Sequence, residues 1–571
     1  MINQTRTLLV VALLFVVYLL WQAWQHDYPA VPPPPPPASS AVVPSAEPQV
    51  AAVPTAPAST PQASAPPPPP PVTTRATPKQ ALVTASNDVL KLTIDPRGGT
   101  IVGAALLDYP QKVKRGSPPV QLLNEKPDDY YVAQNGLIGA DGSAAPSHLA
   151  EFTPQTRQYS LAPGQDKVTV TLDWHDPATG VAVVKRYTLT RGSYVVGLSQ
   201  QIDNRGDKPW HGNAYEQLDR VEPPPPPKHL LEFYNPDSFA FTGGAWYSPE
   251  AKFNKLKFDD FGKDPLRQSV TGGWIAMTER FFVSAWIPND KRVQEFTSVE
   301  LPAPAGGTPR YVIRSIGPGL TVAPGASATS DARLYVGPNL QNRLGSIAPG
   351  LNLTIAYGWS TLIAQPMFKL LSFLDGLVHN WGLAIIVLVL LIQAATWKLT
   401  EAQYKSGARM RKLQPRLKAL KERFGDDKQK YQQAMMELYK KEKVNPVAGC
   451  LPVLITLPIF FALYYVLIYS VELRHAAFLW IPDLSSNDPY FILPVLYGLA
   501  MLGTTFLTPM QAGMDGTQAK LMKLMPVLSV VIFIFFPAGL TLYYTVRSIC
   551  NLGQQWYITR KIERAEARAR A

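Results

Sequence analysis

Arg547 has the most unusual chemistry for its position in this sequence, because it lies inside a long apolar stretch. It follows the Pro537-Ala538-Gly539 turn by about eight residues, or roughly 12 Å at 1.5 Å of rise per helical residue. A charge at that depth in a membrane is costly and usually faces a helix-bundle interior or a water-filled cavity. The alternative is an arginine that reaches back to the membrane surface from a short helix. We favour the cavity, where a cation attracts anionic groups.

Other polar side chains lie in apolar stretches of the same kind. Gln393 is the clearest of them and Thr456 is a weaker one, whereas Tyr543 and Tyr544 flank Arg547. Together these residues could line a polar indentation within the membrane. Their chemistry is that of a binding surface.

Sequence patterns typical of catalysis are missing. The sequence contains no phosphate-binding loop of the G-x-x-x-x-G-K type, no H-E-x-x-H and no G-x-S-x-G. The seven histidines are scattered, and none pairs with another at the spacing of metal ligands on a helix. Two cysteines in 571 residues exclude a disulfide framework and a cysteine-rich metal site. We therefore expect no cofactor, no metal ion and no activity of the hydrolase, ATPase or redox class.

Apolar stretches of membrane-spanning length must position these residues. The first lies between Arg6 and Asp27 and has 20 uncharged residues, which is enough to cross a hydrocarbon core of about 30 Å. Its Trp21 and Trp24 favour an uncleaved anchor over a cleavable signal peptide. Later uncharged stretches predict five more spans, at about 380–398, 446–470, 489–509, 521–537 and 539–558.

The formal net charge of +12 is concentrated in two segments. Residues 398–446 carry 14 Lys and Arg against 6 Asp and Glu, a net +8, and the tail from Arg560 carries five basic and two acidic residues, a net +3. The loop at 471–488 has one Arg and three acids. Because basic loops stay in the cytosol, this pattern places both termini there and puts residues 80–345 on the opposite side of the membrane.

The segments outside the spans differ in composition. Residues 29–79 are rich in proline, which predicts an extended linker. Residues 80–345 alternate apolar and polar residues in short runs separated by Gly and Pro, as in Asp88–Asp95, which predicts a β-sandwich. We expect an amphipathic helix within 346–379 to lie at the membrane surface, with an ordinary core helix as the alternative. Two apolar-periodic runs within 399–445 predict a cytosolic helical hairpin in which Pro415 begins or bends the first helix.

Several motifs resemble those of one family of membrane proteins. They are Asn380–Gly382, Leu413–Pro415, Gly425–Asp427, Lys443–Tyr465, Ser470–Arg474 and Phe536–Tyr544, together with Asp88–Gly99 upstream. These segments resemble the YidC/Oxa/Alb family of membrane protein insertases, in the Gram-negative form that has a large periplasmic domain. The resemblance covers nearly the whole chain except the Pro-rich linker.

The resemblance implies a multi-domain membrane protein. Its parts are an N-terminal transmembrane anchor at 1–28, a periplasmic β-sandwich of the supersandwich type, a five-helix α-helical insertase core at 380–559 and a basic cytosolic tail at 560–571. The core of this family forms a groove that is open to the cytosol and the lipid. The β-sandwich also resembles that of sugar mutarotases, although a shared fold does not confer an activity.

The implied function is the insertion, folding and assembly of integral membrane proteins in the bacterial inner membrane, alone or with the Sec translocon. The implied partners are nascent membrane proteins, the ribosome, the signal recognition particle pathway and the phospholipid bilayer, with no small-molecule substrate.

One position departs from the family pattern. Relatives usually carry an arginine in the second span, and the motif match puts Gln393 at that position. Arg547 in turn falls where relatives commonly have a small polar residue. We therefore hypothesise that the positive charge of the groove has moved from the second span to the last. Further positions that match the substrate groove of the family are Val389, Leu457, Phe460 and Tyr544. Helix packing is the alternative role for the two of these that lie in the third span.

The hairpin and the basic tail resemble the surfaces through which this family contacts cytosolic partners. The residues that we assign to these contacts are Arg416, Lys418, Asp426, Asp427, Arg560 and Lys561. The alternative is that the basic residues serve only to orient the chain in the membrane.

Two other functions are compatible with parts of the sequence. A transporter or channel would show inverted repeats and polar residues in several spans, and no repeat is present. A membrane-tethered carbohydrate enzyme would need an acid/base pair within 80–345, and the sequence gives no sign of one. We expect an insertase.

Overall fold

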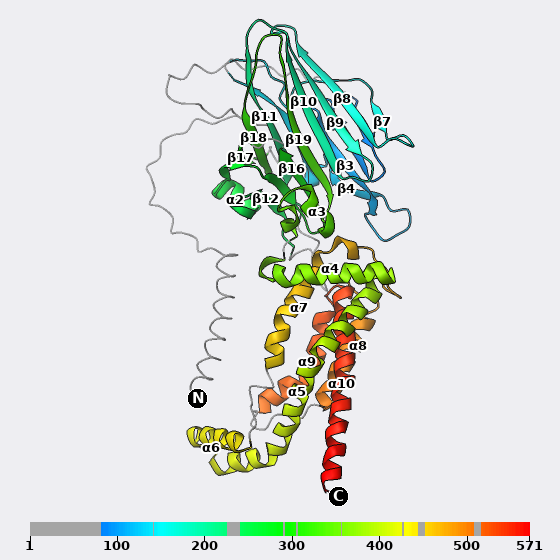
Figure 1. Ribbon diagram of the computed structural model, residues 1–571, viewed down its shortest axis with the longest axis vertical. Helices are drawn as coiled ribbons and strands as arrows, with labels where there is room; N and C mark the ends of the chain where they lie inside the picture. Colours follow the sequence, from blue (N-terminus) through cyan, green and yellow to red (C-terminus); the bar gives the residue numbers. More distant parts are fainter. Residues whose placement is uncertain are drawn as a thin grey trace. The chain divides into compact units, whose positions relative to one another are not determined.

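The computed structural model describes residues 81–140, 142–224, 240–288, 292–303, 307–355, 357–424, 427–442, 451–507 and 516–570. The predicted N-terminal anchor at 1–28 and the predicted linker at 29–79 lie outside the described residues. We call residues 81–355, which are rich in strands, the β-region, and residues 357–570 the helical region (Figure 1).

The β-region contains two sheets in which nearly all neighbouring strands are antiparallel. The first has the order β14-β17-β18-β11-β5-β3-β2-β1-β7, with β4 paired to β3, and the second has the order β13-β12-β15-β16-β19-β10-β9-β8-β6. The strands are β1 Val83–Ser86, β2 Leu90–Asp95, β3 Thr100–Pro110, β4 Pro119–Leu123, β5 Tyr131–Gly139, β6 Thr153–Pro154, β7 Gln158–Ser160, β8 Lys167–Asp176, β9 Val181–Thr190, β10 Val195–Asn204, β11 Trp210–Val221, β12 Gly243–Ser248, β13 Lys252–Leu256, β14 Arg267–Thr271, β15 Trp274–Thr278, β16 Phe282–Pro288, β17 Val293–Leu301, β18 Arg310–Val322 and β19 Ser327–Pro338. Two short helices, α2 Phe258–Lys263 and α3 Gln341–Ile347, accompany them.

The two sheets face each other across a shared apolar core. Strands β9 and β10 bury every second residue along their length, because successive side chains of a strand point to opposite faces. Trp286 of β16 is buried, and its indole Nε1 donates to the carbonyl of Gln217 on β11, which belongs to the other sheet, over 3.1 Å. The β-sandwich predicted from alternating residues is therefore confirmed.

The helical region contains seven α-helices within the described residues. They are α4 Thr361–Val378, α5 Trp381–Phe424, α6 Lys428–Lys441, α7 Leu451–Tyr469, α8 Ile492–Leu507, α9 Gly516–Phe533 and α10 Ala538–Arg570. The C-terminal helix α10 packs against α5 and α8, and α4 packs against α5 and α7. Large apolar side chains such as Leu499 and Phe506 of α8 and Val527 of α9 are exposed, as expected for surfaces that face lipid.

Two described helical segments, Thr361–Val378 and Trp381–Lys398, are long and apolar enough to cross a membrane. Leu457–Tyr469, Ile492–Leu507 and Leu524–Phe533 are shorter apolar helices. These five segments include α4 and leave out α10, whereas the predicted spans lie on α5, α7, α8, α9 and α10, so the five-span core stays a prediction.

Helix α4 corresponds to the predicted surface helix, although its length and composition also suit a span. It lies across the ends of α5 and α7 instead of alongside them (Figure 1). One side of α4 is buried, where Phe368 stacks on Trp381 with 6.4 Å between ring centroids. The other side exposes Leu362, which is 86% accessible, and Phe373. One buried face and one exposed apolar face suit a helix at the lipid boundary, so we retain that interpretation.

Helix α5 differs from the expectation that a span ends near residue 398 and a separate hairpin helix follows. The helix is continuous from Trp381 to Phe424 and includes Pro415 in its interior. Proline removes one backbone hydrogen bond and bends a helix without necessarily ending it, and α5 changes direction in its C-terminal part (Figure 1). The predicted pairing with a second helix is present, since Leu413 and Leu417 of α5 are buried against Tyr439 of α6.

Candidate functional site

Helix α10 carries a stripe of polar side chains along an otherwise apolar segment. Its members are Tyr543, Arg547, Asn551 and Gln554, at spacings of four, four and three residues. Residues at these spacings share one face of a helix. Hydrogen bonds from this stripe to α5 show that the polar face is directed at α5.

Gln393 of α5 bonds directly to this stripe. Its side-chain amide Nε2 donates to Asn551 Oδ1 over 2.8 Å and to Gln554 Oε1 over 2.7 Å. Gln554 Nε2 donates in turn to the backbone carbonyl of Trp397, 3.3 Å away. Gln393 is 9% exposed, so these bonds satisfy a buried amide that would otherwise be costly in an apolar environment. The predicted site residue Gln393 therefore joins α5 to α10.

Arg547 lies one helical turn from Asn551 and is half-buried. Its Nη1 donates to the hydroxyl of Tyr543 over 3.3 Å. Within the described part of the chain, no carboxylate forms an ion pair with this guanidinium. A guanidinium has five N–H donors, so a single bond to a tyrosine leaves most of them available for another acceptor. The arrangement gives α10 a positive charge that can bind an anionic group.

An aromatic cluster adjoins the polar stripe. The ring of Tyr544 lies 5.3 Å from Phe460 of α7, 5.2 Å from Phe533 of α9 and 6.3 Å from Tyr497 of α8, measured between centroids. Tyr544 is also 5.0 Å from Tyr543, whose hydroxyl accepts the bond from Arg547. The predicted residues Arg547, Tyr543, Tyr544 and Phe460 thus form a continuous chain of contacts, in which the two tyrosines are buried.

The remaining predicted groove residues are less closely connected to Arg547. Leu457 is 40% exposed on α7, which leaves it accessible, whereas Val389 is buried in the packing of α5. The side chain of Thr456 lies outside the described residues. A substrate-facing role for these three residues stays a prediction.

Sequence reasoning missed three residues of this network. They are Asn551, Gln554 and Tyr404, the last of which donates its hydroxyl to the carbonyl of Asn551 over 3.4 Å. Asn551 and Gln554 could have been found by extending the helical spacing from Arg547 by four and seven residues. Nothing in the local sequence marks Tyr404, because its contact depends on how α5 and α10 cross.

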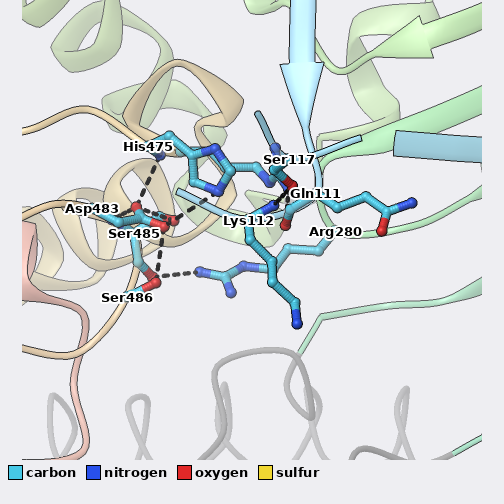
Figure 2. Close-up of polar contacts among 9 residues, drawn as sticks. Gln111, Lys112, Ser117, Arg280, His475, Asp483, Ser485 and Ser486 are labelled. Carbon is cyan, nitrogen blue, oxygen red and sulfur yellow. Dashed lines mark hydrogen bonds and ion pairs between the residues drawn. The ribbon is translucent and has the colours of Figure 1, made fainter. Parts of the chain in front are cut away.

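The segment 470–491, here called the helix-end loop, connects α7 to α8 and is organised by Asp483. One carboxylate oxygen of Asp483 accepts the backbone N–H groups of His475 and Ser485, at 3.0 and 2.8 Å, and the hydroxyl of Ser485 at 2.7 Å. The other accepts the hydroxyl of Ser486 over 2.9 Å (Figure 2). A buried carboxylate with four donors fixes the loop in one conformation.

The helix-end loop is bonded to the first residues of α10 and to the start of α5. The carbonyls of Ser486 and Leu484 accept the N–H groups of Ala538 and Gly539, at 2.6 and 2.8 Å, which satisfies donors that a helix N-terminus leaves unpaired. A β-carbon on Gly382 of α5 would come within 2.2 Å of the Phe478 ring, so only glycine fits there. The loop therefore holds the starts of α5 and α10 next to the ends of α7 and α8 that it connects.

Known proteins match both the β-region and the helical region of this chain. The family model described as "YidC periplasmic domain" matches residues 82–370, and the one described as "60Kd inner membrane protein" matches residues 373–566. The protein named "Membrane protein insertase YidC" from Aeromonas salmonicida (strain A449) is 42% identical over 566 residues, which cover 98% of each chain. This chain belongs to the YidC family of membrane protein insertases. The similarly named protein of Thioalkalivibrio sulfidiphilus (strain HL-EbGR7) is 40% identical over 570 residues, 99% of each chain.

Among solved structures, the chain has a weaker overall likeness to "Active YidC insertase crystal structure with the first transmembrane domain resolved". The TM-score is 0.37 at 20% identity, and the match covers 84% of this chain and 93% of that one.

Family membership gives the β-region its place in the cell, since the matched model describes residues 82–370 as a periplasmic domain. We therefore expect the end of the helical region that contacts the β-region to be the periplasmic end. The helix-end loop lies at this end, because Arg474 Nη2 donates to the carbonyl of Gln111 in the β-region over 3.2 Å.

The described residues among those predicted to contact cytosolic partners lie on α5, at the N-cap of α6 and on α10. Asp427 caps α6 by accepting the N–H groups of Gln429 and Lys430, and Arg416 forms an ion pair with Glu442. Arg560 lies over the Trp556 ring, 4.1 Å from its centroid. Lys561 is exposed on α10, whereas Asp426 and the side chain of Lys418 lie outside the described residues. Contact with partners stays a prediction for all six.

The β-region contains buried ionisable groups that the sequence did not reveal. Burial lowers the pKa of Lys185 to about 7, and its Nζ donates to the carbonyls of Gly98 and Asn135 at 2.7 and 3.1 Å. Burial likewise raises the pKa of the Glu216 carboxyl to about 8. Glu216 and Asp331 are two of the residues that line a cleft of about 240 Å³. The YidC relatives of this chain are named as insertases and not as carbohydrate enzymes.

Proposed function

We propose that this chain inserts integral membrane proteins into the bacterial inner membrane and assists their folding and assembly. The substrate site is a hydrophilic groove formed by α5, α7 and α10, open to the cytosol and the lipid and closed at the periplasmic end by the helix-end loop. The chain acts as an insertase and chaperone rather than an enzyme and needs no cofactor.

The observation that carries this proposal is the guanidinium of Arg547 beside the aromatic cluster around Tyr544 of the same helix. Arg547 has one described hydrogen bond, to Tyr543, and no described carboxylate partner. Phe460 and Tyr544 provide apolar contact next to it. An incoming membrane protein has a polar flank and an apolar segment. The guanidinium can contact the flank while the aromatic rings contact the apolar segment.

The free energy for insertion comes from the substrate. Burying an apolar side chain releases about 1.5–3 kcal/mol, so a segment of about 20 such residues moves into lipid downhill. The barrier is the transfer of the polar flank, because charges are costly in hydrocarbon. A hydrated groove that contains a positive charge lowers that barrier for acidic flanks, and no nucleotide is required.

We further propose that Arg547 supplies the charge that relatives carry in the second span, where this chain has Gln393. The two positions are linked through Asn551, which accepts a bond from Gln393 and lies one turn from Arg547. A charge on either helix would therefore act on the same groove. The chain works alone or with the Sec translocon, and its hairpin and tail meet ribosomes and the signal recognition particle pathway.

Photo-crosslinking tests this proposal. Benzoylphenylalanine in place of Phe460 or Tyr544 keeps an aromatic ring at each position and leaves Arg547 intact. We expect both variants to crosslink to the apolar segment of a ribosome-stalled nascent membrane protein. The matched control is the same residue at Phe506, which is exposed on α8 and lies outside the aromatic cluster. If the nascent protein crosslinked only to probes placed in the β-region, the groove would not be the substrate site.

A further inference from the structure

Arg280 connects the β-region to two parts of the helical region. It lies in the turn between β15 and β16 and is only 9% exposed. Its Nε donates to the carbonyl of Ile468 over 3.0 Å, and its Nη2 lies 3.5 Å from the carbonyl of Ser485 (Figure 2). The guanidinium also lies over the Phe281 ring, 4.3 Å from the centroid. A buried arginine with several defined partners is held in one orientation.

The two carbonyls that Arg280 contacts belong to the end of α7 and to the helix-end loop. Ile468 is in the last turn of α7, where carbonyls have no partner within the helix and a cation is favoured by the helix dipole. Ser485 lies between Leu484 and Ser486, whose carbonyls accept the N–H groups at the start of α10. One side chain of the β-region thus bridges the end of α7 and the segment that caps α10.

Two other contacts support the same junction. Arg474 of the helix-end loop donates to the carbonyl of Gln111, and its guanidinium lies 5.6 Å from the ring centroid of Phe282. Gln341 at the start of α3 donates its Nε2 to the hydroxyl of Ser470 over 3.0 Å. Three separate segments of the β-region therefore contact the loop that begins with the Ser470–Arg474 motif.

We propose that the β-region braces the periplasmic ends of α7 and α10, and that Arg280 is the positioning residue of this brace. This inference rests on the proposed function, because the brace affects insertion only if the substrate groove lies between α7 and α10. Phe460 is on α7, and Tyr544 and Arg547 are on α10. Fixing the periplasmic ends of α7 and α10 fixes the spacing between these two helices and so between the residues that they carry. The β-region then acts at a distance from the substrate, by keeping the periplasmic end closed.

Hydrogen exchange on the full chain in detergent tests the brace directly. Arg280→Ala should raise the exchange rate of the backbone amides of residues 466–486, 538 and 539 by about tenfold or more, since exchange follows local opening. Arg280→Lys retains the positive charge and one donor nitrogen and should give a smaller increase. The matched control is Arg191→Ala, because Arg191 also donates to two backbone carbonyls, those of Ala162 and Gln165, but is exposed within the β-region. Unchanged exchange in both Arg280 variants would overturn the proposal.

An insertion assay on the same variants separates the brace from the proposed function. We expect Arg280→Ala to insert a client at a several-fold lower rate and Arg280→Lys to recover part of that rate. Faster exchange combined with an unchanged insertion rate would overturn the positioning role. Failure of the unsubstituted chain to insert any client would instead contradict the proposed function, and the exchange result would still decide whether the brace exists. Should Arg280→Ala fail to fold, the comparison of Arg280→Lys with Arg191→Ala decides whether the brace exists and whether it affects insertion.

Discussion

Arg547→Ser is expected to abolish growth of cells that depend on this chain as their insertase, because it removes the positive charge from the proposed groove. The guanidinium is half-buried and has no described carboxylate partner, so a serine should leave the fold intact. At an effective dielectric constant of about 20, two unit charges 4 Å apart attract by about 4 kcal/mol. Loss of even a third of that attraction corresponds to about tenfold in binding. Arg191→Ser, which removes an exposed arginine from the β-region, serves as the control.

Adding Gln393→Arg to Arg547→Ser should restore growth, because it moves the charge back to the second span. Gln393 Nε2 already lies 2.8 and 2.7 Å from two amide oxygens, and a guanidinium there would find the same acceptors. Normal growth with Arg547→Ser alone would contradict the hypothesis that this arginine is the groove charge. Recovery with Gln393→Lys as well would show that the charge matters more than the planar shape of a guanidinium.

Asp483→Ala should destabilise the helical region by about 3–5 kcal/mol, because it leaves buried donors of the helix-end loop without an acceptor. The carboxylate is 6% exposed and accepts two backbone N–H groups and two hydroxyls. We expect a lower melting temperature of the detergent-solubilised chain and a smaller fraction of folded protein in the membrane. Asp483→Asn, which keeps the shape but loses the charge, should have an intermediate effect.

Asp128→Ala provides the comparison for this variant, since Asp128 is exposed and lies in the β-region. It should leave the melting temperature unchanged. Equal melting temperatures for Asp483→Ala and Asp128→Ala would show that the loop does not depend on its carboxylate.

The local sequence predicts the elements of this protein better than their contacts. Alternating residues predict strands such as β9, and an isolated charge in an apolar stretch marks Arg547, because both signals are read within one element. The bonds of Gln393 are different, since Asn551 lies 158 residues further along the chain. Whether Gln393 faces a groove or a neighbouring helix depends on how α5 and α10 cross, and no local pattern contains that information.

Two further features show that contacts between distant elements are not predicted by the local sequence. Pro415 predicts that the first hairpin helix begins or bends there, and α5 is continuous from Trp381 through this proline, since packing of Leu413 and Leu417 against α6 holds the turns on both sides. Arg280 occurs in a strand connection that resembles an ordinary surface turn in the sequence. Its partner Ile468 is 188 residues away, so only the folded chain reveals the contact.

Insertion by the purified chain in phospholipid vesicles tests the central claim most directly. The measurement is protease protection of a single-span client that carries an acidic flank, added to vesicles that contain the chain and no nucleotide. We predict that the flank becomes protected in these vesicles, that a client with a basic flank is inserted less efficiently, and that Arg547→Ser reduces the difference between the two clients. Protection no greater than in empty vesicles, or protection that requires nucleotide hydrolysis, would contradict an insertase that draws its free energy from the substrate.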